Sequence, residues 1–141
     1  MENILGFTPA HSPDSFAIVD TRRNVFPIVG PTPPYPTNAP CWVAKGPGNV
    51  WYMGNSPGQA ISIFFSDGEG GTFYKSITLP GVPTDLTVSR DAKWLAVIYT
   101  AADGSGGRIA LFAIDDFGDL SFAATSNPVG VTSFNGVAIS Q

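Results

Sequence analysis

The chain has 141 residues, of which 43% are hydrophobic and only 13% are charged, and it contains 16 glycines and 13 prolines. Globular proteins carry about 25% charged residues, and a helical protein would not tolerate so many glycines and prolines. Seven basic residues against eleven acidic ones give a net charge of −4, which excludes an electrostatic nucleic-acid binder. We therefore predict an all-β protein built from many short strands and tight turns.

No stretch of the sequence approaches the roughly 18 consecutive apolar residues of a membrane-spanning helix, so we expect no membrane association. Residues 1–3 begin without the basic and apolar regions of a signal peptide. The sequence therefore leaves two compartments: the cytoplasm, or the outside of the cell after a leader has been removed. Cys41 is the only cysteine, which excludes an intramolecular disulfide and a multi-cysteine metal site. We expect its thiol to be buried and inert.

Residues 1–36 are expected to form the later part of one sheet unit. Strands are predicted at 15–20 and 25–29, joined by a turn, and residues 3–8 are a candidate for one more strand. The proline-rich run 31–36 has two interpretations. Polyproline segments bind aromatic grooves, but we favour a stiff connector between sheet units.

The next two spans, 40–80 and 83–127, are expected to be successive copies of a four-stranded antiparallel unit. Residues 40–44 align with 83–87, and the offset grows further along because the second copy has a longer loop. A period of about 40 to 50 residues is typical of propeller blades. The predicted strands are 41–45, 50–55, 60–66 and 72–79 in the first copy, and 85–89, 94–100, 108–114 and 120–125 in the second.

The side-chain pattern of these strands predicts which faces are buried. Ile61 and Ile63 alternate with the polar Ser62, as in a strand with one buried face. Residues 94–99 are apolar on both faces. This pattern is expected for a strand that lies between two neighbouring blades.

Residues 135–140 repeat the opening strand of a unit, because Val137 and Ile139 take the places of Leu86 and Val88. The whole chain is thus predicted to be a single partial β-propeller domain. It would contain part of one blade, two complete blades and the opening strand of another.

Three segments at blade spacing resemble a known family: APCWVA at 39–44, PTDLTVSRD at 83–91 and NGVA at 135–138. In these segments the sequence is similar to the lactonase-like seven-bladed propellers, which include 6-phosphogluconolactonases and carboxy-muconate cyclases. The resemblance runs from about residue 15 to the end, and it implies the last third to half of a family member. It also implies a site at the central channel, which the family builds from His, Arg and Glu side chains.

No catalytic residue of the family is carried over to this chain. His11 is the sole histidine and lies outside the matched strands, and we expect Glu2 and Glu69, near a terminus and in a hairpin turn, to be solvated. Lactone hydrolysis needs a base and a stabilised oxyanion, and the chain has no Gly-x-Ser-x-Gly elbow. We also expect no cofactor.

The acidic cluster of Asp115, Asp116 and Asp119 has two interpretations. Calcium takes several oxygen ligands from a flexible loop, but the spacing of these residues fits no standard calcium loop. We favour an ordinary hairpin turn and predict no metal site.

The ligand-binding candidates are Trp42, Asp85 and Asn135. They lie at or near the start of successive innermost strands, where propellers gather ligand-contacting side chains around the channel mouth. A small-molecule ligand is therefore one interpretation. The alternatives, which we favour, are blade packing for Trp42 and local turn hydrogen bonds for Asp85 and Asn135.

Propellers typically have four to eight blades, because a ring of sheets covers faces that would otherwise aggregate. Two or three blades alone leave apolar faces open, so we expect a homo-oligomer or association with the missing blades. For function we predict a non-catalytic structural or binding module that completes a larger propeller. The alternative is a lactone-processing hydrolase or cyclase whose site forms only on assembly.

Overall fold

The computed structural model describes residues 2–5, 16–20, 28–29, 40–66, 71–130 and 135–140. Every helix or strand in these ranges is a β-strand, and none of the described residues belongs to a helix that could cross a membrane. The predictions for His11, the proline-rich run 31–36 and Glu69 lie outside the described residues, and only the backbone of Glu2 is described.

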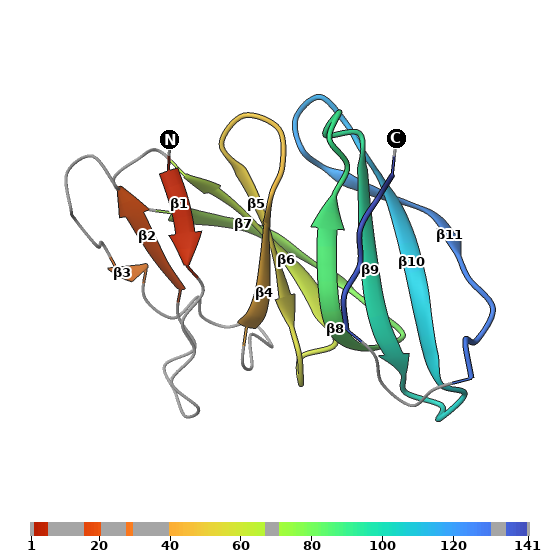
Figure 1. The fold of residues 1–141 in the computed structure, drawn as a ribbon. Coiled ribbons are helices and arrows are strands. Elements are labelled where there is room, and N and C mark those ends of the chain that lie inside the picture. The colour runs from red at the N-terminus through yellow and green to blue at the C-terminus, as the bar shows by residue number, and fades with distance from the viewer. Residues whose placement is uncertain are drawn as a thin grey trace.

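The strands form three antiparallel sheets that follow one another along the chain (Figure 1). The N-terminal sheet contains β1 (Glu2–Leu5), β2 (Phe16–Asp20) and β3 (Ile28–Val29). The first blade contains β4 (Pro40–Lys45), β5 (Val50–Asn55), β6 (Ala60–Ser66) and β7 (Gly71–Thr78). The second blade contains β8 (Gly81–Val88), β9 (Trp94–Ala101), β10 (Gly107–Ile114) and β11 (Leu120–Thr125).

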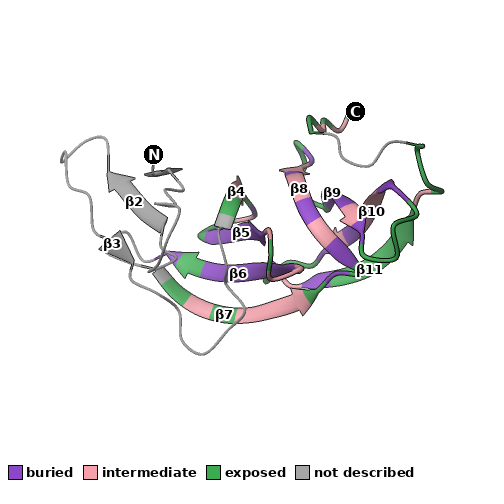
Figure 2. Ribbon diagram, turned by 90° about the horizontal axis from the view of Figure 1, so that it is seen from below, coloured by how far each residue is buried: buried purple, intermediate pink, exposed green. Residues whose placement is uncertain are grey.

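In both blades the spatial order of the strands equals their order in the sequence, so each blade is a four-stranded meander. Figure 2 shows β4 and β8 on the inside of the curve that the sheets describe, and β7 and β11 on the outside. The innermost strands β4 and β8 contact each other. The predicted all-β fold with two four-stranded propeller blades is confirmed.

Both blades carry β-bulges at matching places. In the innermost strand pair the extra residues are Cys41 in the first blade and Thr84 in the second. In the outermost pair they are Tyr74 and Ala123. Because a bulge bends its strand and increases the local twist, the shared bulges give the two sheets the same curvature, as expected for two copies of one unit.

The two blades pack face to face and bury a continuous apolar core. Val50, Tyr52 and Ile63 of the first blade meet Val97 and Phe112 of the second, and all five are almost completely buried. Burial of such a side chain stabilises the fold by about 1.5–3 kcal/mol. The alternation of the strands thus directs one face of each blade into a shared interface.

The opposite face of the first blade is also buried. Trp51, Met53 and Phe64 form a second cluster there, with Val43 and Phe73 packed against it. Every residue of β5 is buried as a result. The first blade therefore has the two covered faces that a sheet inside a propeller requires.

Residues 135–140, for which the sequence predicts the opening strand of a next blade, are irregular in the isolated chain. They run beside β8 (Figure 1) and are hydrogen-bonded to Asp85. A strand is defined by its ladder of backbone hydrogen bonds to a neighbour, and no described strand pairs with this segment. The assignment of residues 135–140 as a strand therefore stays a prediction, which requires a neighbouring sheet.

Candidate functional site

Trp42 lies in β4 and packs against the core between the blades. A Cβ atom added to Gly54 would lie 3.2 Å from Leu86 Cδ2 and 3.6 Å from Trp42 Cε3. The glycine thus leaves room for the indole ring and the leucine to pack against the same backbone. This placement agrees with a role of Trp42 in blade packing.

Asp85 lies in β8, and its carboxylate accepts three backbone hydrogen bonds. Oδ1 accepts from the N–H of Leu86 at 2.8 Å, and Oδ2 accepts from the N–H groups of Gly136 at 2.8 Å and Val137 at 3.2 Å. Charge-assisted bonds of this kind are stronger than neutral ones. Asp85 therefore joins the innermost strand of the second blade to the C-terminal segment.

Asn135 immediately precedes the two N–H groups that Asp85 binds, and its side chain is exposed. The structure thus brings the segment that carries Asn135 up to Asp85, whereas Trp42 belongs to the core between the blades. The three predicted residues occupy successive innermost positions but differ in what surrounds them. Asp85 holds backbone groups, but two of the three belong to Gly136 and Val137, so its hydrogen bonds are not those of a local turn alone.

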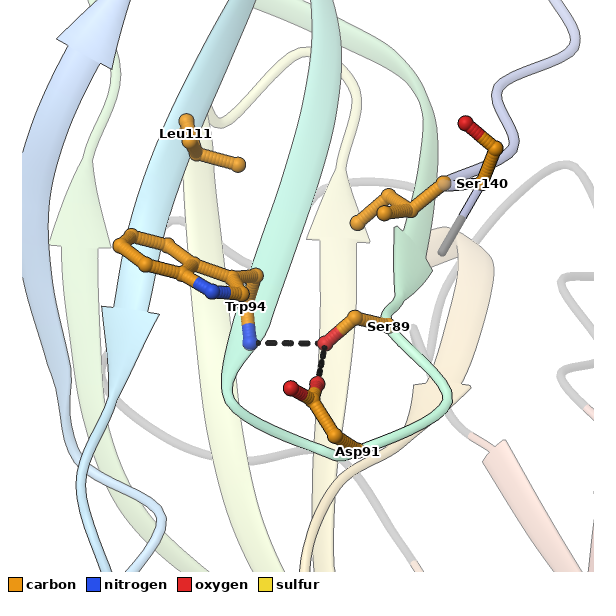
Figure 3. A pocket seen from close by; sticks show the side chains of 6 residues that line it. Ser89, Asp91, Trp94, Leu111 and Ser140 are labelled. Atoms are coloured by element: carbon orange, nitrogen blue, oxygen red, sulfur yellow. Dashed lines mark hydrogen bonds between the residues drawn. The ribbon is translucent and has the colours of Figure 1, made fainter.

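A cavity of about 450 Å³ lies between the C-terminal segment and the second blade (Figure 3). Its lining comes from the β8–β9 hairpin, from β10 and from the C-terminal segment. The lining residues are Ser89, Asp91, Trp94, Leu111, Ile139 and Ser140. Sequence reasoning missed this cavity because its walls come from segments that are far apart in the chain. The available signal was the apolar pattern of residues 94–99.

The polar groups of this cavity are used within the β8–β9 hairpin. Ser89 Oγ donates to Asp91 Oδ1 at 2.6 Å and accepts from the backbone N–H of Trp94 at 2.9 Å (Figure 3). The hydrogen bond from Ser89 lowers the pKa of Asp91 below its ordinary value. The remaining lining residues are Ser140 and the apolar Trp94, Leu111 and Ile139. The cavity therefore favours an apolar occupant.

The acidic cluster forms a hairpin turn between β10 and β11. Asp115 Oδ1 accepts from the N–H groups of Phe117 at 2.9 Å and Asp119 at 2.8 Å. Asp116 forms an ion pair with Lys93. The turn is thus built by Asp115 itself, and no group of three His, Cys, Asp or Glu side chains within the described residues is arranged to hold a metal ion.

Asp119 forms an ion pair with Lys75 that connects the two blades. Lys75 Nζ lies 2.7 Å from Asp119 Oδ2, across from β7 to the β10–β11 turn. The hydrogen bond from Lys75 lowers the pKa of Asp119 and raises that of Lys75. Both groups therefore stay charged at neutral pH, and the pair adds an electrostatic contact at the outer rim of the interface.

The prediction of a buried thiol at Cys41 is wrong. The side chain of Cys41 is exposed. Cys41 is the extra residue of the bulge between Pro40 and Trp42, and a bulge re-aims the side chains of its strand. The bulge therefore accounts for the exposure of the Cys41 side chain.

No family model and no curated protein matches the chain. Among solved structures, the chain is similar to a protein from Lactobacillus plantarum, with a TM-score of 0.64 and 14% identity over 89% of the chain. It is also similar to a functionally unknown protein from Desulfotomaculum acetoxidans, with a TM-score of 0.54 and 17% identity over 81%. A third is hydrazine synthase from Kuenenia stuttgartiensis, with a TM-score of 0.58 and 18% identity over 77%.

The chain spans only part of each of these structures: 37%, 49% and 28% of their respective lengths. At such low identity the likeness concerns the fold alone. It supports the propeller-like arrangement of the blades.

Proposed function

We propose that this chain is a structural or binding module that supplies propeller blades and docks a further blade on the open face of its second blade. The proposal rests on one observation, which is the unequal cover of two equivalent faces. We call the face that each blade turns toward the next blade its leading face. The leading face of the first blade is covered by the second blade, whereas that of the second blade is open at Trp94, although Ala96 and Ile98 on the same face are buried.

Equivalent positions make the comparison direct. Val50 and Trp94 each open the second strand of their blade, and both belong to the leading face. Val50 is 4% exposed, whereas Trp94 is 39% exposed. Ile63 and Leu111 are likewise equivalent, and Ile63 is fully buried while Leu111 lines the cavity. At these two positions the second blade thus presents apolar side chains where the first blade has an interface.

Exposed apolar surface of this kind marks interaction sites in soluble proteins, and a propeller covers it with the next blade. Asp85 supports the same conclusion. Its carboxylate binds backbone groups of the segment that would open the next blade, so the segment is held beside β8. The resemblance to lactonase-like propellers agrees with such a module, because it concerns the strands that build blades.

Light scattering of the purified chain tests the proposal. We expect association to particles of more than one chain, and weaker association in Trp94→Lys, which introduces a charge on the leading face. Phe117→Lys introduces the same charge at a turn residue that is 83% exposed, and it should leave association unchanged. Circular dichroism should show both variants folded.

A chain that stays monomeric at every concentration would overturn the proposal. Lactone hydrolysis by the assembled protein that is lost in Asp85→Ala would contradict the non-catalytic part. That result would support the alternative of a lactone-processing hydrolase or cyclase.

A further inference from the structure

Asn135 and Gly136 form a dipeptide in which the asparagine side chain can react with the backbone. The nitrogen of the following residue, once it has lost its proton, attacks the side-chain carbonyl carbon, and a residue without a Cβ atom leaves that nitrogen unhindered. Gly136 has a φ of 94°, which residues with a Cβ atom rarely adopt. Asn135 is exposed. The pair thus combines an accessible amide with an unhindered nucleophile.

Asp85 binds the hydrogen atom on which this reaction depends. Its Oδ2 accepts from the N–H of Gly136 at 2.8 Å and from that of Val137 at 3.2 Å. These hydrogen bonds are strong because their acceptor is charged, and the carboxylate also disfavours a second negative charge on the nitrogen. While the bond is intact, the Gly136 nitrogen keeps its proton and does not attack. The reaction therefore requires the segment to leave Asp85 first.

We propose that Asn135 is a deamidation site whose reaction is controlled by the hydrogen bond between Asp85 and Gly136. When this bond opens, the Gly136 nitrogen loses its proton and forms a bond to Asn135 Cγ. The bond between Cγ and Nδ2 breaks, and the amide nitrogen takes up a proton and leaves as ammonia. One water molecule then opens the cyclic imide to an aspartate or an isoaspartate at position 135. The net reaction consumes only water and releases only ammonia.

The modification also weakens the contact that controls it. The product carries a carboxylate next to the two N–H groups that Asp85 binds, and the two negative charges repel each other. An isoaspartate in addition lengthens the backbone by one carbon atom, which displaces the N–H of Gly136. Deamidation therefore releases the C-terminal segment from β8 permanently. All of these groups belong to one chain, so the reaction does not depend on the docking of a further blade.

The test compares deamidation with amide hydrogen exchange in the full chain. Peptide mass spectrometry after incubation at mildly alkaline pH measures the conversion of Asn135, and exchange measures the opening of Gly136. Both reactions need the open segment, so Asp85→Ala should accelerate both by the same factor, at least about tenfold. Asp91→Ala removes a carboxylate from the adjacent hairpin and should change neither rate. A synthetic peptide with the sequence of residues 133–139 gives the rate without protection.

Two exposed asparagines serve as references within the same chain. Asn127 precedes a proline, which has no N–H, and Asn49 precedes the β-branched Val50. Both should react more slowly than Asn135 in Asp85→Ala. In the wild type, Asn135 should react at least about tenfold more slowly than in the peptide. Conversion of wild-type Asn135 at the peptide rate, or equal conversion in Asp85→Ala and the wild type, would overturn the proposal.

Asn135→Asp tests the effect of the product directly. The variant supplies the new carboxylate without the reaction, and exchange at Gly136 should become about two- to fivefold faster, because exposed charges interact weakly. Asn127→Asp adds the same charge at another exposed position and should leave this exchange unchanged. Equal exchange in Asn135→Asp and the wild type would refute the release of the segment by deamidation.

Discussion

The hydroxyl of Tyr52 in the first blade donates a 2.8 Å hydrogen bond to the carbonyl oxygen of Gly118 in the second. The bond is buried and links residues that are 66 positions apart. Gly118 has a φ of 85°, and a Cβ atom at this position would lie 2.5 Å from Val50 Cγ2. Only a glycine lets the β10–β11 turn approach the first blade closely enough for this contact.

Tyr52→Phe should lower the free energy of unfolding by about 1–3 kcal/mol, because it leaves the buried carbonyl of Gly118 without its donor. Urea unfolding measures the change. Tyr99→Phe is the matched control, since the Tyr99 hydroxyl pairs with Thr125 in a partly buried contact within the second blade. A loss for Tyr52→Phe no larger than for Tyr99→Phe would contradict the importance of the contact between blades.

The free energy of unfolding should fall at alkaline pH because of the raised pKa of Tyr52. Burial, with the charges of Asp115 and Asp119, raises the pKa of Tyr52 above its ordinary value, which is about 10. The folded chain therefore keeps the proton that the unfolded chain loses, so this contribution is complete below about pH 10 and declines above it. Between about pH 9 and 11 the wild type should lose more stability than Tyr52→Phe, as measured by urea unfolding. Parallel losses would contradict the prediction.

The ion pair of Lys75 and Asp119 should contribute little to stability at neutral pH. The two side chains are 37% and 33% exposed, so Lys75→Met should cost less than about 1 kcal/mol. Lys75 lowers the pKa of Asp119, so the contribution is present above the ordinary carboxyl pKa of about 3.9 and is lost as the pH falls through the lower folded-state value.

Urea unfolding of Lys75→Met at neutral pH, at about pH 2 and in about 1 M salt measures this contribution. The cost should disappear under the last two conditions. Lys93→Met is the control, because the pair of Lys93 and Asp116 is more exposed and lies within the second blade. An equal or larger effect for Lys93→Met would contradict the prediction that the ion pair between the blades contributes more to the free energy of unfolding.

Ala92→Gly should stabilise the chain. Ala92 has a φ of 55° in the β8–β9 hairpin, a left-handed conformation that costs a residue with a Cβ atom about 1–2 kcal/mol. Glycine removes this strain but loses more entropy on folding, so the expected gain is up to about 1 kcal/mol. Thermal unfolding measures it.

Gly104→Ala provides the reverse substitution for comparison. Gly104 has a φ of 74° and open space around its Cα, so the added methyl group meets no clash and the change reports backbone strain alone. We expect a loss of about 1 kcal/mol. A gain in both variants, or a loss in both, would show that backbone strain does not determine stability at these turns.

Asp85→Ala should release the C-terminal segment without unfolding the blades. The variant loses the acceptor for Gly136 and Val137, and hydrogen bonds to a charged group contribute about 1.5–3 kcal/mol. Amide exchange at these two residues should become at least about tenfold faster. Asp91→Ala, in the adjacent hairpin, should leave them unchanged. Unchanged exchange in Asp85→Ala would show that the carboxylate does not hold the segment.

Much of the fold follows from local patterns in the sequence. The predicted strand 94–100 is observed as Trp94–Ala101, and 60–66 is observed as Ala60–Ser66. The alternation of Ile61, Ser62 and Ile63 identified the strand, because a strand turns alternate side chains to opposite faces. The bulge at Cys41 was not predictable in this way, since it depends on the register with β5.

The candidate site was predictable only in part. Asp85 was identified from its place at the start of an innermost strand, but its partners Gly136 and Val137 are about fifty residues away in the chain. The cavity beside Trp94 and Leu111 was not identified at all. Both features form where segments that are distant in the sequence come together, so no local sequence pattern predicts them.

The sequence by itself determined the strands, the turns and the repetition of one unit, because these depend on neighbours along the chain and on the two-residue period of a strand. Only the tertiary structure decided that Val50 is covered and Trp94 is open, and that the carboxylate of Asp85 binds backbone groups. The physical reason is that cover and hydrogen-bond partners come from contacts between segments distant in sequence. These contacts form only when one sheet packs against another.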